Sequence, residues 1–182
     1  MVETAEKLMT IAEFLEWDDG TDTRYELIRG KVVAMVPPRA PRSVILANLG
    51  AMLDGSPPPY YAGIAAGVLP QDRDDTFYVA DLVVSCTPLD ADIPTIPKPT
   101  MIIEVLSPTT AEHDRGGKLY DYRGIAPVQE IALVASEQRH VEVWRRRGAK
   151  WEVEDLIGDA ALELEAVDVK IPFAAINAES GV

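Results

Sequence analysis

A chain of 182 residues, 47% hydrophobic and 26% charged, has room for one well-packed domain and differs in composition from disordered and fibrous proteins. Its 17 basic residues against 30 acidic ones give a net charge of −13, which argues against a protein that coats nucleic acid through a basic surface. An enzyme that holds divalent cations with carboxylates stays compatible with this charge, because a bound metal inverts the local field. We expect residues 1–182 to form a single domain.

Location in the cell is addressed by two features of the sequence. No segment resembles the apolar core of a signal peptide, and the longest apolar stretch, residues 60–70, is about half the length that a bilayer needs. Cys86 is the only cysteine, so an intramolecular disulfide and a CxxC metal site are excluded. We therefore expect a cytoplasmic protein without a membrane partner. Cys86 follows an apolar run, which predicts a buried thiol.

The first third of the chain predicts a helix, a hairpin and a second helix. Thr10 and Glu13 have the spacing of a capping box that opens a short helix over MTIAEFLEW. Two alternating apolar runs on either side of Arg29-Gly30 predict a tight β-hairpin over residues 24–36. Apolar residues at helical spacing then predict an amphipathic helix over residues 42–55.

The remainder predicts a sheet with one further helix. Strands are expected at Ile64–Leu69, Phe77–Cys86, Met101–Leu106, and over QEIALVA, HVEVWRRR and KWEVEDLI. The prolines of residues 87–99 exclude a central strand there. A helix over AEHDRGGKLYDYRG is expected to be capped by Thr109 or Thr110 and weakened by its glycine pair. The acidic tail, with IPFAAI near its end, is expected to close the sheet or pack on it. The pattern indicates an α/β (α+β) protein.

Two carboxylates interrupt apolar strands of this predicted sheet. Asp81 lies within YVADLVV and Glu104 within MIIEVL, and a buried carboxylate is costly unless it is paired, hydrogen-bonded or bound to a cation. On neighbouring strands, the two side chains can form an oxygen-rich site for a hard ion such as Mg²⁺. The alternative is that each acid caps a strand end or pairs with an arginine.

Lys118 and Glu26 are two further candidates. Lys118 lies on the helix predicted after the strand of Glu104, where an ammonium group can stabilise negative charge on a phosphate or orient the attacking water. Taken alone, a helix lysine is typical of a solvated surface. Glu26 is the only acid of the first hairpin strand, and from the residues alone a solvent-facing position is expected for it.

Other reactive or charged residues have simpler interpretations. His113 and His140 each lack a second histidine at ligand spacing, which argues against a zinc site. The basic run 145–147 can contact phosphates, but a solvated hairpin turn before Gly148 is the simpler interpretation. The chain contains no GxxxxGK[ST], GxGxxG or GxSxG string, so nucleotide-binding and serine-hydrolase motifs are absent.

The order of RYELIRGKVVAM, YVADLVV, IIEVLSPTT, DRGGKLYDYRG and VEVWRR resembles the Uma-type restriction endonuclease family of the PD-(D/E)XK nuclease superfamily. The resemblance runs from about Thr10 to Arg147, and EVLSPTT followed by DRGGKLYDY is its most distinctive piece. It implies a restriction-endonuclease-like fold, with a mixed central sheet flanked by helices, and Mg²⁺-dependent hydrolysis of phosphodiester bonds.

The resemblance also assigns site residues. Asp81 matches the acid of the PD element, and Glu104 matches the (D/E) of the second element. Leu106 occupies the position of the motif lysine, and Lys118 on the following helix is the lysine that matches in its place. Glu26 matches the acid that other nucleases of the superfamily place at the start of the core. The implied metal ligands are Asp81, Glu104 and Glu26, with Lys118 as a further catalytic residue.

The chain departs from the family pattern in places. Ala80 replaces the proline of PD, and Arg42 stands where relatives carry a histidine after the hairpin, so any role of that histidine is absent here. Asp114, Arg115 and Tyr122 lie within the matched string without a clear role, as a helix cap or packing residues. None of these departures removes an implied metal ligand.

The resemblance implies Mg²⁺ as cofactor, with Mn²⁺ as a substitute, a nucleic-acid substrate that we expect to be DNA, and a homo-oligomer such as a homodimer. The alternative hypothesis is a catalytically silent relative that keeps the scaffold as an oligomeric binding or structural module. Its motivation is the net charge of −13, which opposes the approach of DNA at low salt.

Overall fold

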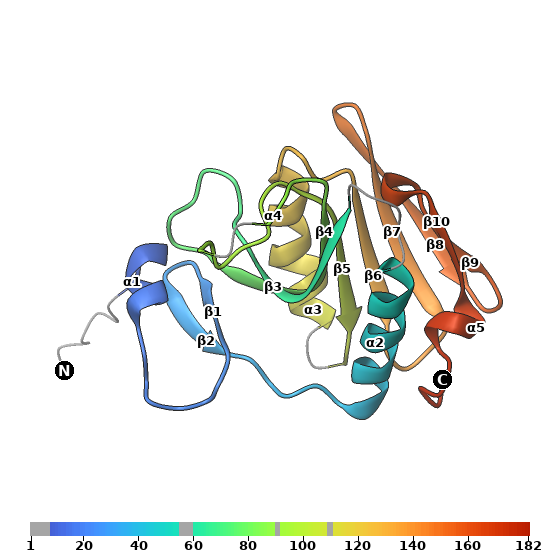
Figure 1. Cartoon of the computed structure of the whole chain (residues 1–182), viewed down its shortest axis with the longest axis horizontal. Coiled ribbons are helices and arrows are strands. Elements are labelled where there is room, and N and C mark those ends of the chain that lie inside the picture. The colour runs from blue at the N-terminus through green and yellow to red at the C-terminus, as the bar shows by residue number, and fades with distance from the viewer. Residues whose placement is uncertain (1–7, 55–59, 90–91, 109–110) are drawn as a thin grey trace.

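A six-stranded mixed sheet forms the centre of the computed structural model, which describes residues 8–54, 60–89, 92–108 and 111–182 (Figure 1). The strands are β3 (Tyr61–Val68), β4 (Tyr78–Ser85), β5 (Pro99–Leu106), β6 (Glu130–Ala135), β7 (His140–Arg147) and β8 (Lys150–Ile157), in that spatial order. Only β5 and β6 pair in parallel; the other neighbours are antiparallel. The predicted mixed sheet is confirmed.

The parallel pair β5–β6 is connected by the predicted helix, which has three parts. These are α3 (Ala111–His113), the π-helical turn η1 (Asp114–Lys118) and α4 (Leu119–Gly124). The π turn contains the glycine pair, which therefore widens the helix without ending it. The two candidate caps, Thr109 and Thr110, lie outside the described residues.

The two faces of the sheet carry separate hydrophobic cores. On one face, α2 (Ala40–Asp54) packs with the C-terminal elements β9 (Ala161–Leu164), η2 (Glu165–Val167), β10 (Val169–Pro172) and α5 (Phe173–Ile176). The other face is covered by α4 through Leu119 and Tyr122. Strands β4 and β5 lie between both cores, which explains their nearly continuous apolar sequences. The expectation that the tail packs on the sheet is confirmed.

The N-terminal elements lie at one end of the sheet, and the C-terminal strands β9 and β10 lie at the other end (Figure 1). Helix α1 (Ile11–Glu16) begins with the predicted capping box. Strands β1 (Tyr25–Ile28) and β2 (Lys31–Ala34) form the predicted hairpin, whose turn residues Arg29 and Gly30 have φ of 53° and 80°. Leu27 bridges to Phe77 just before β4, with N···O distances of 2.9 and 2.8 Å. This bridge brings β1 beside the start of β4.

Two predictions about exposure and charge are wrong. Cys86 is exposed, because β4 ends at Ser85 and the chain leaves the sheet there. The basic run 145–147 is solvated only at Arg147, beside the turn: Arg145 is buried and pairs with Glu130, and Arg146 donates to carbonyl oxygens. Within the described ranges, no helix is both long and apolar enough to cross a membrane.

Candidate functional site

Strands β4 and β5 separate at Asp81 and Glu104. The last residue pair of their ladder is Leu82 with Ile103. Beyond this pair, the next residue is Asp81 on β4 and Glu104 on β5. The backbone N–H of Val105 donates to Asp81 Oδ2 at 2.8 Å, and the N–H of Asp81 lies 3.4 Å from Glu104 Oε2. Each carboxylate therefore accepts a backbone hydrogen bond from the opposite strand, replacing ladder bonds that end there.

The neighbouring pair of strands is also irregular at Asp81. The β3–β4 ladder pairs Ile64 with Leu82 and Ala66 with Ala80, and it omits the pair of Ala65 with Asp81. Ala65 has φ of 52°, an uncommon value for a residue with a side chain. Such backbone conformations concentrate at functional sites. Asp81 thus lies where β4 is incompletely paired on both sides.

Lys118 lies behind this opening, in the last position of the π turn. Its Nζ is 2.8 Å from Glu26 Oε1, and 3.3 Å from both Glu104 Oε1 and the carbonyl oxygen of Val79. Asp114 Oδ1, one turn earlier, is 3.8 Å away. The side chain of Lys118 is 5% exposed, so it is not a solvated surface lysine. Its three N–H donors match the three nearest acceptors.

Glu26 and Tyr122 complete the surroundings of Lys118 and Glu104. Glu26 is buried on β1, and its Oε1 also accepts the backbone N–H of Val79 at 2.8 Å. This contact follows from the bridge between β1 and the start of β4. The hydroxyl of Tyr122 donates to Glu104 Oε1 at 2.7 Å. The expectation from the residues alone that Glu26 faces solvent is wrong.

The electrostatics of this group reflect burial and crowding of like charges. Burial raises the pKa of Glu104 to about 8; Lys118 opposes the shift, and Asp81 and Asp114 add to it. Burial alone lowers the pKa of Lys118, but the surrounding carboxylates reverse this effect and raise it. Burial and the charge of Glu104 also raise the pKa of Tyr122 well above its ordinary value, so its hydroxyl stays a donor.

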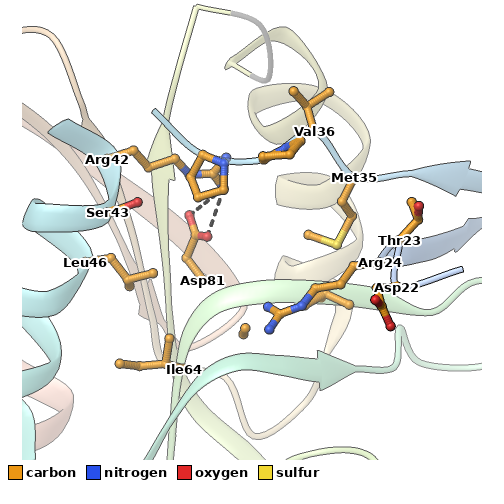
Figure 2. Close-up of a pocket in the computed structure, with 14 residues that line it drawn as sticks. Asp22, Thr23, Arg24, Met35, Val36, Arg42, Ser43, Leu46, Ile64 and Asp81 are labelled. Carbon is orange, nitrogen blue, oxygen red and sulfur yellow. Dashed lines mark hydrogen bonds and ion pairs between the residues drawn. The ribbon is translucent and has the colours of Figure 1, made fainter. Parts of the chain in front are cut away.

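Asp81 forms part of the wall of an open cleft of about 720 Å³ (Figure 2). The cleft is largely apolar and is lined by Asp22, Thr23, Arg24, Met35, Val36, Pro37, Pro38, Arg42, Ser43, Leu46, Ile64, Ala65, Val79 and Asp81. Arg42, in the first turn of α2, places Nη2 2.8 Å from each oxygen of Asp81. Figure 2 shows these two contacts as dashed lines beside the cleft.

The family model Uma2, described as "Putative restriction endonuclease", matches residues 11–172. The chain belongs to this family. The uncharacterized Synechocystis proteins slr1290 and sll1609 are each 26% identical to it, over 161 and 179 residues; these matches cover 85% and 94% of this chain, and 84% and 99% of theirs. A crystal structure of a putative nuclease of DUF820 from Anabaena variabilis superposes with a TM-score of 0.72 at 20% identity, over 92% of this chain and 97% of that one.

The Uma2 assignment confirms the resemblance found in the sequence, and the superposition confirms the restriction-endonuclease-like fold. In this Uma2 chain, the fold brings all four expected site residues, Glu26, Asp81, Glu104 and Lys118, to one end of β4 and β5. Glu26 differs from the expectation in its partners, because its contacts are with Lys118 and Val79.

Three residues of this Uma2 site received no definite role from the sequence: Arg42, Asp114 and Tyr122. The spacing of Asp114, Lys118 and Tyr122, four residues apart on one helix, could have indicated a shared face. Arg42 had no comparable signal, since its partner Asp81 is 39 residues away in sequence.

A second group with metal-ligand atoms lies elsewhere, on β7 and β8. Within the described ranges, His140, Glu142 and Asp155 are the group whose ligand atoms all lie within 4.8 Å of one another. These side chains already have partners: His140 Nε2 is 2.8 Å from Asp155, and Arg115 donates to Glu142 at 2.7 Å. Asp155 is largely exposed, and the group borders no part of the cleft at Asp81.

Proposed function

We propose that the chain is a divalent-metal-dependent nuclease that hydrolyses phosphodiester bonds of DNA at Asp81 and Glu104. The nuclease role is supported by the Uma2 family and by the fold shared with the Anabaena protein. The observation that carries the proposed mechanism is the placement of two acids at the point where β4 and β5 separate, with one of them on the wall of a cleft.

The donor set fits a hard divalent ion. Asp81 and Glu104 offer carboxylate oxygens, the ligand type that Mg²⁺ and Mn²⁺ prefer. Among the described residues, four buried carboxylates, Glu26, Asp81, Glu104 and Asp114, lie around two cationic side chains, Arg42 and Lys118, so acidic groups outnumber basic ones there and add negative charge when ionised. A divalent cation balances this charge. When bound, it supplies Lewis-acid stabilisation of the charge that develops on a phosphate during hydrolysis.

The chain's own residues have separate tasks in this proposal. Asp81 presents its carboxylate to the cleft, and Tyr122 and Lys118 hold the adjacent carboxylate of Glu104 in place by donating to it. Lys118 opposes the protonation of Glu104. By exchanging one of its hydrogen bonds, it orients the water that attacks phosphorus; the P–O bond to the leaving oxygen breaks, and that oxygen takes up a proton as the water loses one. Because Glu26 contacts Lys118 at 2.8 Å, we propose it as the residue that positions this lysine.

Three further parts of the proposal are an Mg²⁺ requirement with Mn²⁺ as a substitute, a cytoplasmic location and a homodimer. Strand β8 is an edge of the sheet and exposes Val153 and Ile157, which suits pairing with a second copy. Light scattering at micromolar concentration tests the dimer, and a strict monomer would remove this part without affecting the catalytic proposal.

The test of function is cleavage of supercoiled plasmid with Mg²⁺ or Mn²⁺, compared with an excess of chelator. We expect Asp81→Asn and Glu104→Gln to lose at least about a hundredfold in rate, because each removes a metal-binding charge. Glu130→Gln is the matched control, since Glu130 is an equally buried strand glutamate outside the site. Cleavage that persists in chelator, or that survives Glu104→Gln, would contradict the mechanism.

One observation favours the alternative of a catalytically silent module. Arg42 already neutralises Asp81 with two contacts at 2.8 Å, which can keep a metal out permanently. Titration of the wild-type chain with Mn²⁺ separates the two functions, since a silent module binds no ion at Asp81.

A further inference from the structure

We propose that Arg42 is a displaceable counter-ion: it occupies the cation position of Asp81 in the metal-free chain, and a divalent ion must displace it to bind. Arg42 then sets the metal affinity of the site. This inference rests on the proposed metal-dependent function and assigns a role to a residue that the family pattern left without one.

The first argument is the position of the guanidinium. A single nitrogen, Nη2, lies 2.8 Å from both Oδ1 and Oδ2 of Asp81, so it lies between the two oxygens. A cation held by both oxygens of this carboxylate would need the same place, because it would have to lie between them. Two cationic centres cannot share this position, because they repel strongly in a largely desolvated environment. Metal binding by both oxygens and the Arg42 contact therefore exclude each other.

The second argument is that Arg42 is weakly held otherwise. Its Nε is buried and lacks a hydrogen-bond partner among the described residues, and its hydrogen bonds there go to Asp81. Arg145 is different, with contacts to Glu130, Glu154 and the carbonyl oxygen of Glu163. Displacement of Arg42 breaks one ion pair, whereas displacement of Arg145 would break a network.

The third argument is the place to which the displaced side chain can move. Arg42 and Arg24 both line the cleft that Asp81 borders (Figure 2). A guanidinium released there meets an anionic substrate in the same cleft, and its planar donors suit bidentate contact with a phosphate. In the metal-free chain, the ion pair with Asp81 thus keeps the Arg42 guanidinium, a phosphate-binding group, beside the reacting centre.

The test is calorimetric titration of Mn²⁺ into the full chain and into two charge-matched variants. Arg42→Gln removes the competitor, so we expect the Kd for Mn²⁺ to fall by about tenfold or more, because Asp81 no longer exchanges a partner. Arg24→Gln removes an equal charge from the same cleft without touching Asp81, and we expect its Kd to stay near that of the wild type. Adding Asp81→Asn to Arg42→Gln should abolish the gain.

The outcomes separate this inference from the proposed function. Tighter binding by Arg42→Gln alone supports both. Binding by Arg42→Gln but not by the wild type supports the competition and overturns the nuclease proposal in favour of the silent module. Equal affinities, or an equal gain in Arg24→Gln, overturn the role of Arg42 and leave the nuclease proposal standing. Absence of binding in every variant overturns both.

A measurement on the unmodified chain guards against misfolding of Arg42→Gln. Titration with diamagnetic Mg²⁺, followed by NMR of the arginine Nε–H groups, should move the Arg42 resonance as its partner changes and leave that of Arg145 in place. A saturating titration that shifts the Glu104 region and leaves Arg42 unmoved overturns the inference.

Discussion

The neighbouring strands β5 and β6 each carry a buried glutamate that pairs with a cationic side chain, and these two pairs differ in their charge balance. Glu104 on β5 pairs with Lys118, and Glu130 on β6 pairs with Arg145; each glutamate is 1% exposed. Burial raises the pKa of both glutamates. Burial and pairing alone therefore do not distinguish a functional carboxylate from a structural one.

The Glu130 site is saturated with partners. Arg145 Nε donates to Glu130 Oε1 at 2.9 Å, and the other glutamate oxygen accepts the backbone N–H of Ala166 at 3.0 Å. The remaining nitrogens of Arg145 donate to Glu154 and to the carbonyl oxygen of Glu163. These contacts connect the sheet to β9 and η2, which is a structural task.

In the Glu104 site one lysine lies between three carboxylates, and a fourth carboxylate lies at the cleft. Lys118 is within 3.8 Å of Glu26, Glu104 and Asp114, while Asp81 faces the cleft and relies on Arg42. The contrast indicates that a surplus of buried negative charge beside an open cleft, and not a buried ion pair as such, marks the candidate site.

Removing each cation tests this contrast with the largest expected effect. Lys118→Met and Arg145→Met each leave a buried carboxylate uncompensated, and we expect each to lower the free energy of unfolding by about 3–5 kcal/mol in urea titrations. Millimolar Mn²⁺ should restore part of the loss in Lys118→Met and none in Arg145→Met, because only the former site can exchange a lysine for a metal. If Mn²⁺ restored the stability of both variants equally, the two sites would not differ in their capacity to bind a metal.

Metal binding should stabilise the chain through one site and not the other. A ligand at a hundred times its Kd adds about 2.7 kcal/mol to the free energy of unfolding, which thermal or urea unfolding with Mn²⁺ can detect. We expect Glu130→Gln to retain this gain and Glu104→Gln to lose it. If both variants retained the stabilisation by Mn²⁺, the ion would bind elsewhere. The next residues to substitute would then be His140, Glu142 and Asp155.

The hydroxyl of Tyr122 tests how strongly Glu104 depends on neutral donors. Tyr122→Phe removes the 2.7 Å bond to Glu104, and hydrogen bonds to charged groups contribute about 1.5–3 kcal/mol, so we expect a loss near the lower value. Tyr78→Phe is the matched control, since its buried hydroxyl donates to Asp121 at 2.8 Å. Both variants should be destabilised, but only Tyr122→Phe should weaken Mn²⁺ binding, as measured by calorimetry.

Local sequence patterns predict most of the fold. The hairpin followed from alternating apolar residues around Arg29-Gly30, and the buried strands from the apolar runs that contain Asp81 and Glu104. These features depend on neighbours in sequence, so a single sequence carries them. The prediction of a buried Cys86 is wrong because one residue decides whether a position is the end of a buried strand or the start of an exposed loop.

The partners of the site residues are less predictable, because they depend on contacts between distant segments. Glu26 becomes buried because Leu27 bridges to Phe77, a contact that the alternation within the hairpin cannot reveal. The solvated turn predicted for Arg145 is wrong because the sequence alone does not reveal the order of the strands, and this order places Arg145 beside Glu130. Family resemblance supplied Lys118, and geometry supplied Arg42.

The smallest effect is expected at the outer partner of the Glu130 site. Glu154 is 54% exposed, and its bond to Arg145 is one of several, so Glu154→Gln should lower the free energy of unfolding by less than about 1 kcal/mol. Arg145 keeps Glu130 and the Glu163 carbonyl, and Mn²⁺ binding should not change. Urea unfolding and Mn²⁺ calorimetry on the same sample check both expectations. A loss as large as that of Arg145→Met would mean that the network depends on its exposed member, and the saturated site would then be less redundant than its contacts indicate.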